Sequence, residues 1–344
     1  MKLTKNKIAT SLLVALCAAG FPLSAMAAED SEAMKKAEVL YKQLNDKNQK
    51  KVADAYREVI RTEPDNSKAH HRLGAVLATM DQYDTAILEC KQSVKLDPKS
   101  YLPHVIMGQV YANQGKWADA VKELDQAVAL KPDSYRAWMD LGVVHARTNN
   151  MDEAIRVYGK AAQLKPNDPA AHLNLGVFLG NKGEHKKAIE ELNTAIKLED
   201  GKNFVTYLNL GNVYGDAKED DKAIEAFKTS LRLNGGNALS HSGLGWAYER
   251  KGEMTQAIKE QKIAMKLAPT FPQPVYRYAA VLAAQGKNNE AETEFKKAIN
   301  MKAKDPFAYV EYSKFLKSQN REEEAKKLLQ SVQIAKEGNG KAGN

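Results

Sequence analysis

The sequence predicts an all-α fold in which helical hairpins stack side by side. Gly74, Gly108, Gly142 and Gly176 stand 34 residues apart, and each follows a leucine or a methionine. An alanine lies twelve residues after each of these glycines and after the equivalent residue of every later repeat. Aromatic residues make up only 7% of the chain and charged residues 27%, which suits amphipathic helices better than strands. The alanines are Ala86, Ala120, Ala154, Ala188, Ala223, Ala257, Ala291 and Ala325.

The first 27 residues have the three-part layout of a secretory signal peptide. Three lysines precede an apolar run over residues 12–19, and Ala25 and Ala27 supply the small residues that precede a cleavage site. We expect cleavage between Ala27 and Ala28, and therefore a periplasmic or secreted protein. An uncleaved membrane anchor is the alternative, although the apolar run is much shorter than the ~20 residues of a spanning helix. After cleavage we expect no membrane span.

Charge and cysteine content exclude several kinds of site. Removal of the three lysines in the signal segment lowers the net charge from +8 to +5. These charges are scattered among acidic residues, whereas a nucleic-acid site needs a clustered basic stripe, so we expect no nucleic-acid partner. Cys90 is the one cysteine that remains, which excludes an intramolecular disulfide. It falls at a core position of its repeat, so we expect a buried, unreactive thiol.

One repeat shows the pattern in full. With Tyr135 as position 1, its characteristic residues are Trp138, Leu141, Gly142, Ala154, Tyr158, Ala161 and Pro166. A 34-residue period with this residue set resembles the tetratricopeptide repeat. The resemblance covers about residues 31–333 and implies a right-handed α-solenoid, or superhelix, of helical hairpins.

The repeats divide the chain into segments. We expect a signal peptide over 1–27, a degenerate N-terminal hairpin over 28–66, a C-terminal capping hairpin over 306–333 and a disordered tail over 334–344. Seven tandem repeats occupy 67–100, 101–134, 135–168, 169–203, 204–237, 238–271 and 272–305.

Helix packing accounts for the pattern. Positions 4, 7, 8 and 11 are spaced i, i+3, i+4 and i+7 and form one stripe on the first helix of a hairpin. Positions 20, 24 and 27 form a stripe on the second helix. We expect the small residue at position 8 to face the alanine at position 20, so that the two backbones approach closely. Neighbouring hairpins must then stabilise each other, because one hairpin alone buries too little apolar surface.

A second face of the first helix is the candidate binding surface. The resemblance implies that positions 2, 5, 9 and 12 line a concave groove. Over residues 101–237 these positions are mostly apolar, while the outward positions of the second helices are almost all polar. For any single residue, packing against the neighbouring repeat is the alternative. The predicted groove residues are Leu102, Val105, Gln109, Arg136, Met139, Val143, Leu173, Asn174, Val177, Val205, Leu208, Asn209, Asn212 and Trp246.

Asn174 and Asn209 share position 6, where a run of asparagines grips the partner's backbone in the repeat domain of O-linked N-acetylglucosamine transferases. Asp140 and Arg72 interrupt the run here, so two interpretations stay open: a backbone-gripping role, or ordinary solvated polar residues.

Signals of catalysis are missing. The chain has no phosphate-binding glycine loop and no zinc-protease spacing. His70, His104, His172 and His241 all fall at position 4, the bulky core slot, so we expect them to pack rather than to bind metal. No nucleophile with a neighbouring base can be identified. We therefore expect a protein that is not an enzyme and holds no cofactor or metal.

The function we expect is a non-enzymatic interaction scaffold that binds an apolar or amphipathic peptide segment of an envelope partner in its groove. The alternative is an accessory factor of polysaccharide export or cell-wall synthesis that binds carbohydrate. That alternative requires aromatic platforms in the groove, for which Trp246 and Tyr276 are the candidates. The sequence names neither partner nor pathway, and it leaves homo-oligomerisation open.

Overall fold

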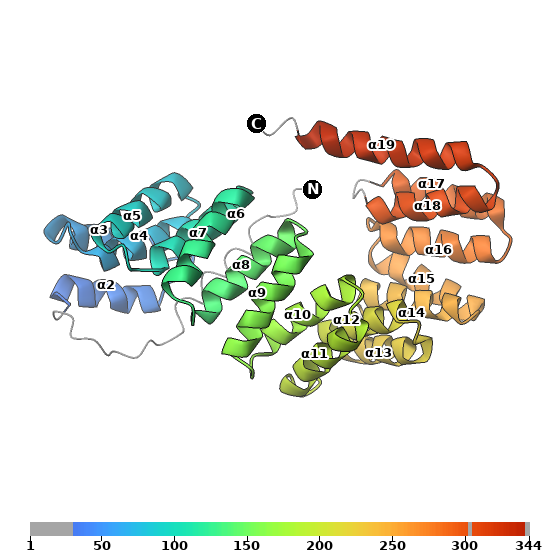
Figure 1. Ribbon diagram of the computed structural model, residues 1–344, viewed down its shortest axis with the longest axis horizontal. Helices are drawn as coiled ribbons and strands as arrows, with labels where there is room; N and C mark the ends of the chain where they lie inside the picture. Colours follow the sequence, from blue (N-terminus) through green and yellow to red (C-terminus); the bar gives the residue numbers. More distant parts are fainter. Residues whose placement is uncertain (1–29, 302–304, 341–344) are drawn as a thin grey trace. The chain divides into compact units, whose positions relative to one another are not determined.

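The computed structural model describes residues 30–301 and 305–340 (Figure 1). The predicted signal peptide therefore lies outside the described residues. The chain divides into two compact units, unit 1 over residues 1–166 and unit 2 over residues 167–344. We call the first helix of each hairpin its A helix and the second its B helix.

Unit 1 contains four helical hairpins, drawn in blue to green in Figure 1. Each A helix packs against the B helix that follows it, and successive A helices also touch. The helices are α2 (Glu32–Lys42), α3 (Gln49–Thr62), α4 (Ser67–Thr79), α5 (Tyr83–Leu96), α6 (Leu102–Asn113), α7 (Trp117–Leu130), α8 (Tyr135–Arg147) and α9 (Met151–Leu164).

Unit 2 continues the same pattern with five hairpins. Its helices are α10 (Pro169–Asn181), α11 (His185–Leu198), α12 (Phe204–Asp216), α13 (Asp220–Leu233), α14 (Ala238–Arg250), α15 (Met254–Leu267), α16 (Pro272–Ala284), α17 (Asn288–Ile299), α18 (Pro306–Ser318) and α19 (Glu322–Gly340).

The predicted all-α solenoid of hairpins is confirmed, since the described residues form eighteen helices and no strand. One expectation about the C-terminus was wrong. Residues 334–340 were expected to be disordered, but α19 continues to Gly340. Ala335, Lys336 and Glu337 are good helix formers and no proline interrupts them, so the helix has no stop signal before the glycines. Residues 341–344 lie outside the described residues.

Small residues allow each hairpin to close. All eight alanines at position 20 are fully buried. The partner of the position-8 glycine is more specific than expected: a Cβ on Gly142 would lie 2.5 Å from Cε1 of Tyr158, at position 24. At Gly176 it would lie 2.8 Å from Cγ of Leu192 and 3.2 Å from the Ala188 carbonyl oxygen. The glycine therefore makes room for the position-24 side chain as well as for the position-20 backbone.

N-cap residues begin several A helices, and glycines form turns between A and B helices. Asn66, Ser134 and Asn237 precede α4, α8 and α14, and the side chain of each accepts a hydrogen bond from a backbone N–H in the first turn. Between the A and B helices, Gly115 has φ +75° and Gly183 has φ +84°, a left-handed conformation that glycine adopts without strain. The hairpin turns predicted at these two glycines are therefore explained by backbone geometry.

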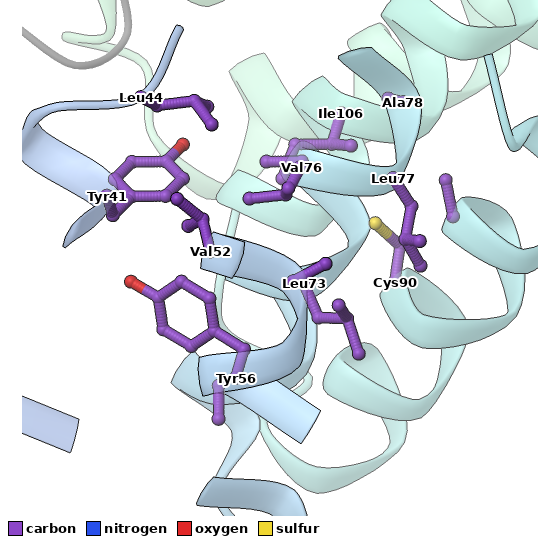
Figure 2. Close-up of a cluster of buried hydrophobic side chains, with 14 of the residues drawn as sticks. Tyr41, Leu44, Val52, Tyr56, Leu73, Val76, Leu77, Ala78, Cys90 and Ile106 are labelled. Carbon is purple, nitrogen blue, oxygen red and sulfur yellow. The ribbon is translucent and has the colours of Figure 1, made fainter. Parts of the chain in front are cut away.

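The degenerate first hairpin shares a core with the hairpins that follow it in unit 1. Figure 2 shows Tyr41 of α2 and Tyr56 of α3 beside Val52, with Leu73 and Val76 of α4 between them and Cys90. The two tyrosine rings meet edge to face with their centroids 5.9 Å apart.

The lone cysteine belongs to this same core. In Figure 2 the sulfur of Cys90 points toward Leu77, and the residue has no exposed surface. Burial raises the pKa of the Cys90 thiol, so the thiolate is suppressed. The expectation of a buried thiol is confirmed.

Candidate protein-binding face of the A helices

The structure sorts the fourteen predicted groove residues into three groups. Val143 and Val205 are exposed, each at 36%. Val105, Gln109 and Leu208 are buried. The other nine are half-buried, and they are Leu102, Arg136, Met139, Leu173, Asn174, Val177, Asn209, Asn212 and Trp246.

For three residues the prediction was wrong: Val105, Gln109 and Leu208 are buried in the folded chain, so a partner cannot contact them. Leu208 packs in a core cluster with Phe227 of α13 and Leu244 of α14. Val105 is only 2% exposed. Position 5 therefore packs inside unit 1 on α6 and inside unit 2 on α12. Packing against the neighbouring repeat was the alternative that the sequence left open.

Gln109 is buried for a different reason: it is part of a polar network in unit 1. Its side-chain nitrogen donates to Oδ2 of Asp140 at 2.6 Å, across from α6 to α8. Nε of Arg136 donates to the same carboxylate at 2.9 Å. Burial raises the pKa of the Asp140 carboxyl, and the Arg136 charge opposes that shift. In the sequence, Asp140 stands out only because it interrupts the run of asparagines at position 6.

In unit 2, Trp246 lies on the backbone of the neighbouring A helix. A Cβ on Gly215 of α12 would fall 2.2 Å from Cζ3 of the indole, so the ring requires glycine there. The guanidinium carbon of Arg277, on α16, lies 4.7 Å from the ring centroid, and that of Arg250 lies 5.5 Å from it. Both distances are in the range of cation–π contacts. The indole is thus held between α12 and α16.

Further apolar side chains of unit 2 extend this face beyond residue 237, the last residue of the range over which the sequence shows mostly apolar groove positions. Leu239 on α14 and Phe307 on α18 occupy position 2, as Val205 does on α12, and all three are exposed. Phe307 reaches 66% exposure, and Val310 follows it at position 5. The same position rule, applied to the later repeats, finds these residues.

The asparagines at position 6 differ in their contacts. Nδ2 of Asn209 donates to the Val205 carbonyl oxygen at 2.9 Å, one turn earlier in α12. Its amide is therefore already engaged within its own helix. Asn174 is half-buried on α10.

The position-4 histidines have partners that the sequence analysis did not identify. His70, His104, His172 and His241 each place Nδ1 at 2.6–2.7 Å from the glutamate nineteen residues later, on the B helix of the same hairpin. Nε2 of His70 also bonds the Pro64 carbonyl oxygen at 2.9 Å. These histidines therefore connect the A and B helices of a hairpin through hydrogen bonds in addition to packing between them.

The family model described as the cilia and flagella-associated protein 70 C-terminal domain matches residues 4–241, more than half of the chain. The chain belongs to this family. It is a tetratricopeptide repeat family, in agreement with the 34-residue hairpins. No curated protein matches the sequence.

Solved structures agree on the fold. A tetratricopeptide repeat protein from Parabacteroides merdae has a TM-score of 0.60 at 18% identity, over 68% of this chain and 92% of that protein. The Cut9–Hcn1 hetero-tetramer of the APC/C has a TM-score of 0.54 at 20% identity, over 83% of this chain and 55% of that one. YrrB, a tetratricopeptide protein with an unusual peptide-binding site, has 0.50 at 18% identity, over 55% and 96%.

Among the residues that the structure describes, no helix combines the length and the apolar character needed to cross a bilayer.

Proposed function

We propose that this protein is a non-enzymatic interaction scaffold that holds an apolar or amphipathic peptide segment of a partner on the A-helix face. The family and fold are those of tetratricopeptide repeats, and similar structures include a peptide-binding protein and a hetero-tetramer subunit. The proposal assigns the same kind of role to this chain.

One observation carries the proposal: apolar side chains line position 2 of three A helices in unit 2. Val205, Leu239 and Phe307 are all exposed there, and Leu173 and Val177 of α10 are half-buried. Core packing does not require such side chains at the surface, and an extended exposed apolar strip is typical of an interaction site. An amphipathic peptide helix that lays its apolar face on a hydrophobic surface is one of the recurrent modes of peptide recognition.

The test replaces the half-buried Leu173 and the exposed Val205 of this face and leaves the buried Leu208 unchanged. We expect Leu173→Arg with Val205→Arg to abolish capture of partner proteins from an envelope extract, with little change in helicity or melting temperature. Leu233→Arg is the matched control, since Leu233 is an exposed leucine on the B helix α13. Equal capture by wild type and the double variant, both folded, would show that this face is not the binding surface.

We further propose that the scaffold works in the cell envelope. The three lysines, the apolar run and the small residues before Ala28 support export through a cleaved signal peptide. Mass determination of the protein purified from its native compartment tests this directly. A mature N-terminus at Ala28 is expected, whereas an intact N-terminal segment in the membrane fraction would favour the anchor.

The carbohydrate-binding alternative gains no support from the A-helix face. Tyr276 is buried, and the indole of Trp246 is covered by Gly215 and Arg277. Neither offers the open aromatic platform on which a sugar ring stacks.

A further inference from the structure

A glycine interrupts the polar outer surface of the B helices in unit 1. It is Gly159, at position 25 of its repeat and in the interior of α9. Glycine inside a helix lowers stability relative to alanine, because its backbone has more freedom to lose on folding. The other tandem repeats have a polar or charged residue at position 25, namely Lys91, Asp125, Asn193, Lys228, Lys262 and Lys296.

Close packing does not explain this glycine. The glycines of the A helices would each bring an added Cβ within 2.8 Å of a neighbouring side chain. An added Cβ on Gly159 would meet no neighbouring atom within 4 Å. A larger residue therefore fits at this position and would make a better helix. A residue that breaks a local rule without a packing reason is a candidate functional residue.

The missing side chain leaves a cavity of about 480 Å³ on the outer surface of the hairpin formed by α8 and α9. The indole of Trp138, on α8, lines this cavity and is 9% exposed. Its Nε1 donates to the Pro132 carbonyl oxygen at 2.9 Å, which fixes the orientation of the ring. The half-buried Ile155 also lines the cavity, together with the exposed Arg156 and Gln163. The cavity is thus apolar at the indole and open to solvent at Arg156 and Gln163.

Two cations line the cavity, and they differ in their partners. Nε of Arg156 lies 2.8 Å from Oε2 of Glu153, and the charge of Asp125 on α7 also acts on this arginine. Lys160 forms no ion pair with any residue that the structure describes. Glu153 lies seven residues before Lys160, which is about 10 Å along the helix axis. The Lys160 end of the cavity therefore attracts an anion.

An aromatic ring suits the remainder of the cavity. It can pack against the indole of Trp138, and its π face attracts the cations of Arg156 and Lys160. A carboxylate next to that ring pairs with Lys160. Because one side of the cavity is open, a free small molecule would stay largely in water, whereas a partner protein holds its own side chain in place. We propose that the outer face of α9 is a second interaction surface, which takes an aromatic side chain of a protein partner that is followed by an acidic residue.

The indole of Trp138 provides a local reporter for the test. Full-length protein with ¹⁵N-labelled tryptophan has three indole resonances, from Trp117, Trp138 and Trp246, and Trp138→Phe identifies the one that matters. The probe is the blocked tetrapeptide Gly-Phe-Glu-Gly, compared with Gly-Phe-Gln-Gly and Gly-Leu-Glu-Gly. We expect the probe to shift the Trp138 resonance and not that of Trp246, with a Kd of ~1 mM. The two comparison peptides should bind about five-fold more weakly.

Three variants test the contribution of each part of the cavity. Gly159→Leu fills it and should weaken binding of the probe about ten-fold, while the melting temperature stays equal to or above that of wild type. Lys160→Gln should bind the glutamate and glutamine peptides equally. Lys228→Gln is the matched control and should behave as wild type, since Lys228 stands at position 25 of α13 in unit 2 and pairs with Glu225.

The inference is overturned if the Trp138 resonance does not move at ~10 mM probe. It is also overturned if wild type binds either comparison peptide as tightly as the probe, or if folded Gly159→Leu binds the probe as wild type does. The wild-type titrations with the three peptides decide the matter alone if a variant does not fold. None of these results bears on the A-helix face, so the proposed function is tested separately.

Discussion

The ion pair between His241 and Glu260 makes stability depend on pH in a direction that can be checked. Nδ1 of His241 lies 2.6 Å from Oε2 of Glu260, and Nε2 lies 3.1 Å from the Gly235 carbonyl oxygen. A carbonyl oxygen and a carboxylate both only accept hydrogen bonds, so the imidazolium, which donates from both nitrogens, satisfies this geometry best. The hydrogen bond to Glu260 accordingly raises the pKa of His241 above 6.5.

The sign of the effect follows from this shift. Because the pKa is higher in the folded state than in the unfolded state, the stabilisation is fully present below about pH 6.5 and is lost as the pH rises through the folded-state pKa. A charge-assisted hydrogen bond contributes ~1.5–3 kcal/mol when buried. His241 is half-buried, so solvent screening reduces the expected contribution to about 1 kcal/mol.

The substitution Glu260→Gln tests this ion pair. We expect it to lower the free energy of unfolding by about 1 kcal/mol at pH 5.5, because the imidazolium of His241 then loses its charged partner. At pH 9 the difference should vanish or reverse, since the glutamine amide can donate to the neutral Nδ1. Urea unfolding followed by circular dichroism at both pH values measures this, with Glu225→Gln as the control. A deficit that is equal at both values, or larger at pH 9, would refute the assignment.

Three other predictions concern unit 1. Ala154→Leu should overpack the hairpin of α8 and α9 and lower the free energy of unfolding by ~1–3 kcal/mol in urea titrations; an unchanged midpoint would contradict the close approach. Cys90 should react with a thiol reagent only as fast as its hairpin opens, so rapid labelling of the native protein argues against burial. Arg72→Met removes the 2.9 Å bond to the half-buried Glu38 and should lower stability by ~1–3 kcal/mol, measured by thermal melting; Arg57→Met, at an exposed pair, should not.

The hairpin architecture was predictable because its signal repeats. The 34-residue spacing of small residues fixes where two helices cross, and every position-20 alanine is buried as that spacing requires. How deeply each side chain of the A-helix face is buried could not be predicted from the sequence. Helical periodicity assigns Leu173 and Leu208 to the same face, but it does not say how near the next helix lies, and only Leu208 joins a core cluster.

The histidine partners could have been found from the sequence. Each repeat with histidine at position 4 has glutamate at position 23, whereas the repeats with Trp138 and Tyr207 at position 4 have Val157 and Ala226 there. Trp138 instead donates from Nε1 to the Pro132 carbonyl oxygen at 2.9 Å. The contacts of Trp246 with Gly215 and Arg277 have no such signal in the sequence, because residues from three helices must first be brought together.

The histidine–glutamate pairs join helices of the same hairpin and never bridge two hairpins. The hydrogen bond to Glu260 raises the pKa of His241, and both residues of this pair belong to the repeat at 238–271. Loss of the proton from His241 therefore lowers the intrinsic stability of that repeat and leaves its helix packing against its neighbours intact. The repeat at 204–237 has tyrosine and alanine at positions 4 and 23, so the repeat at 238–271 should open earlier relative to it in alkaline than in acidic solution.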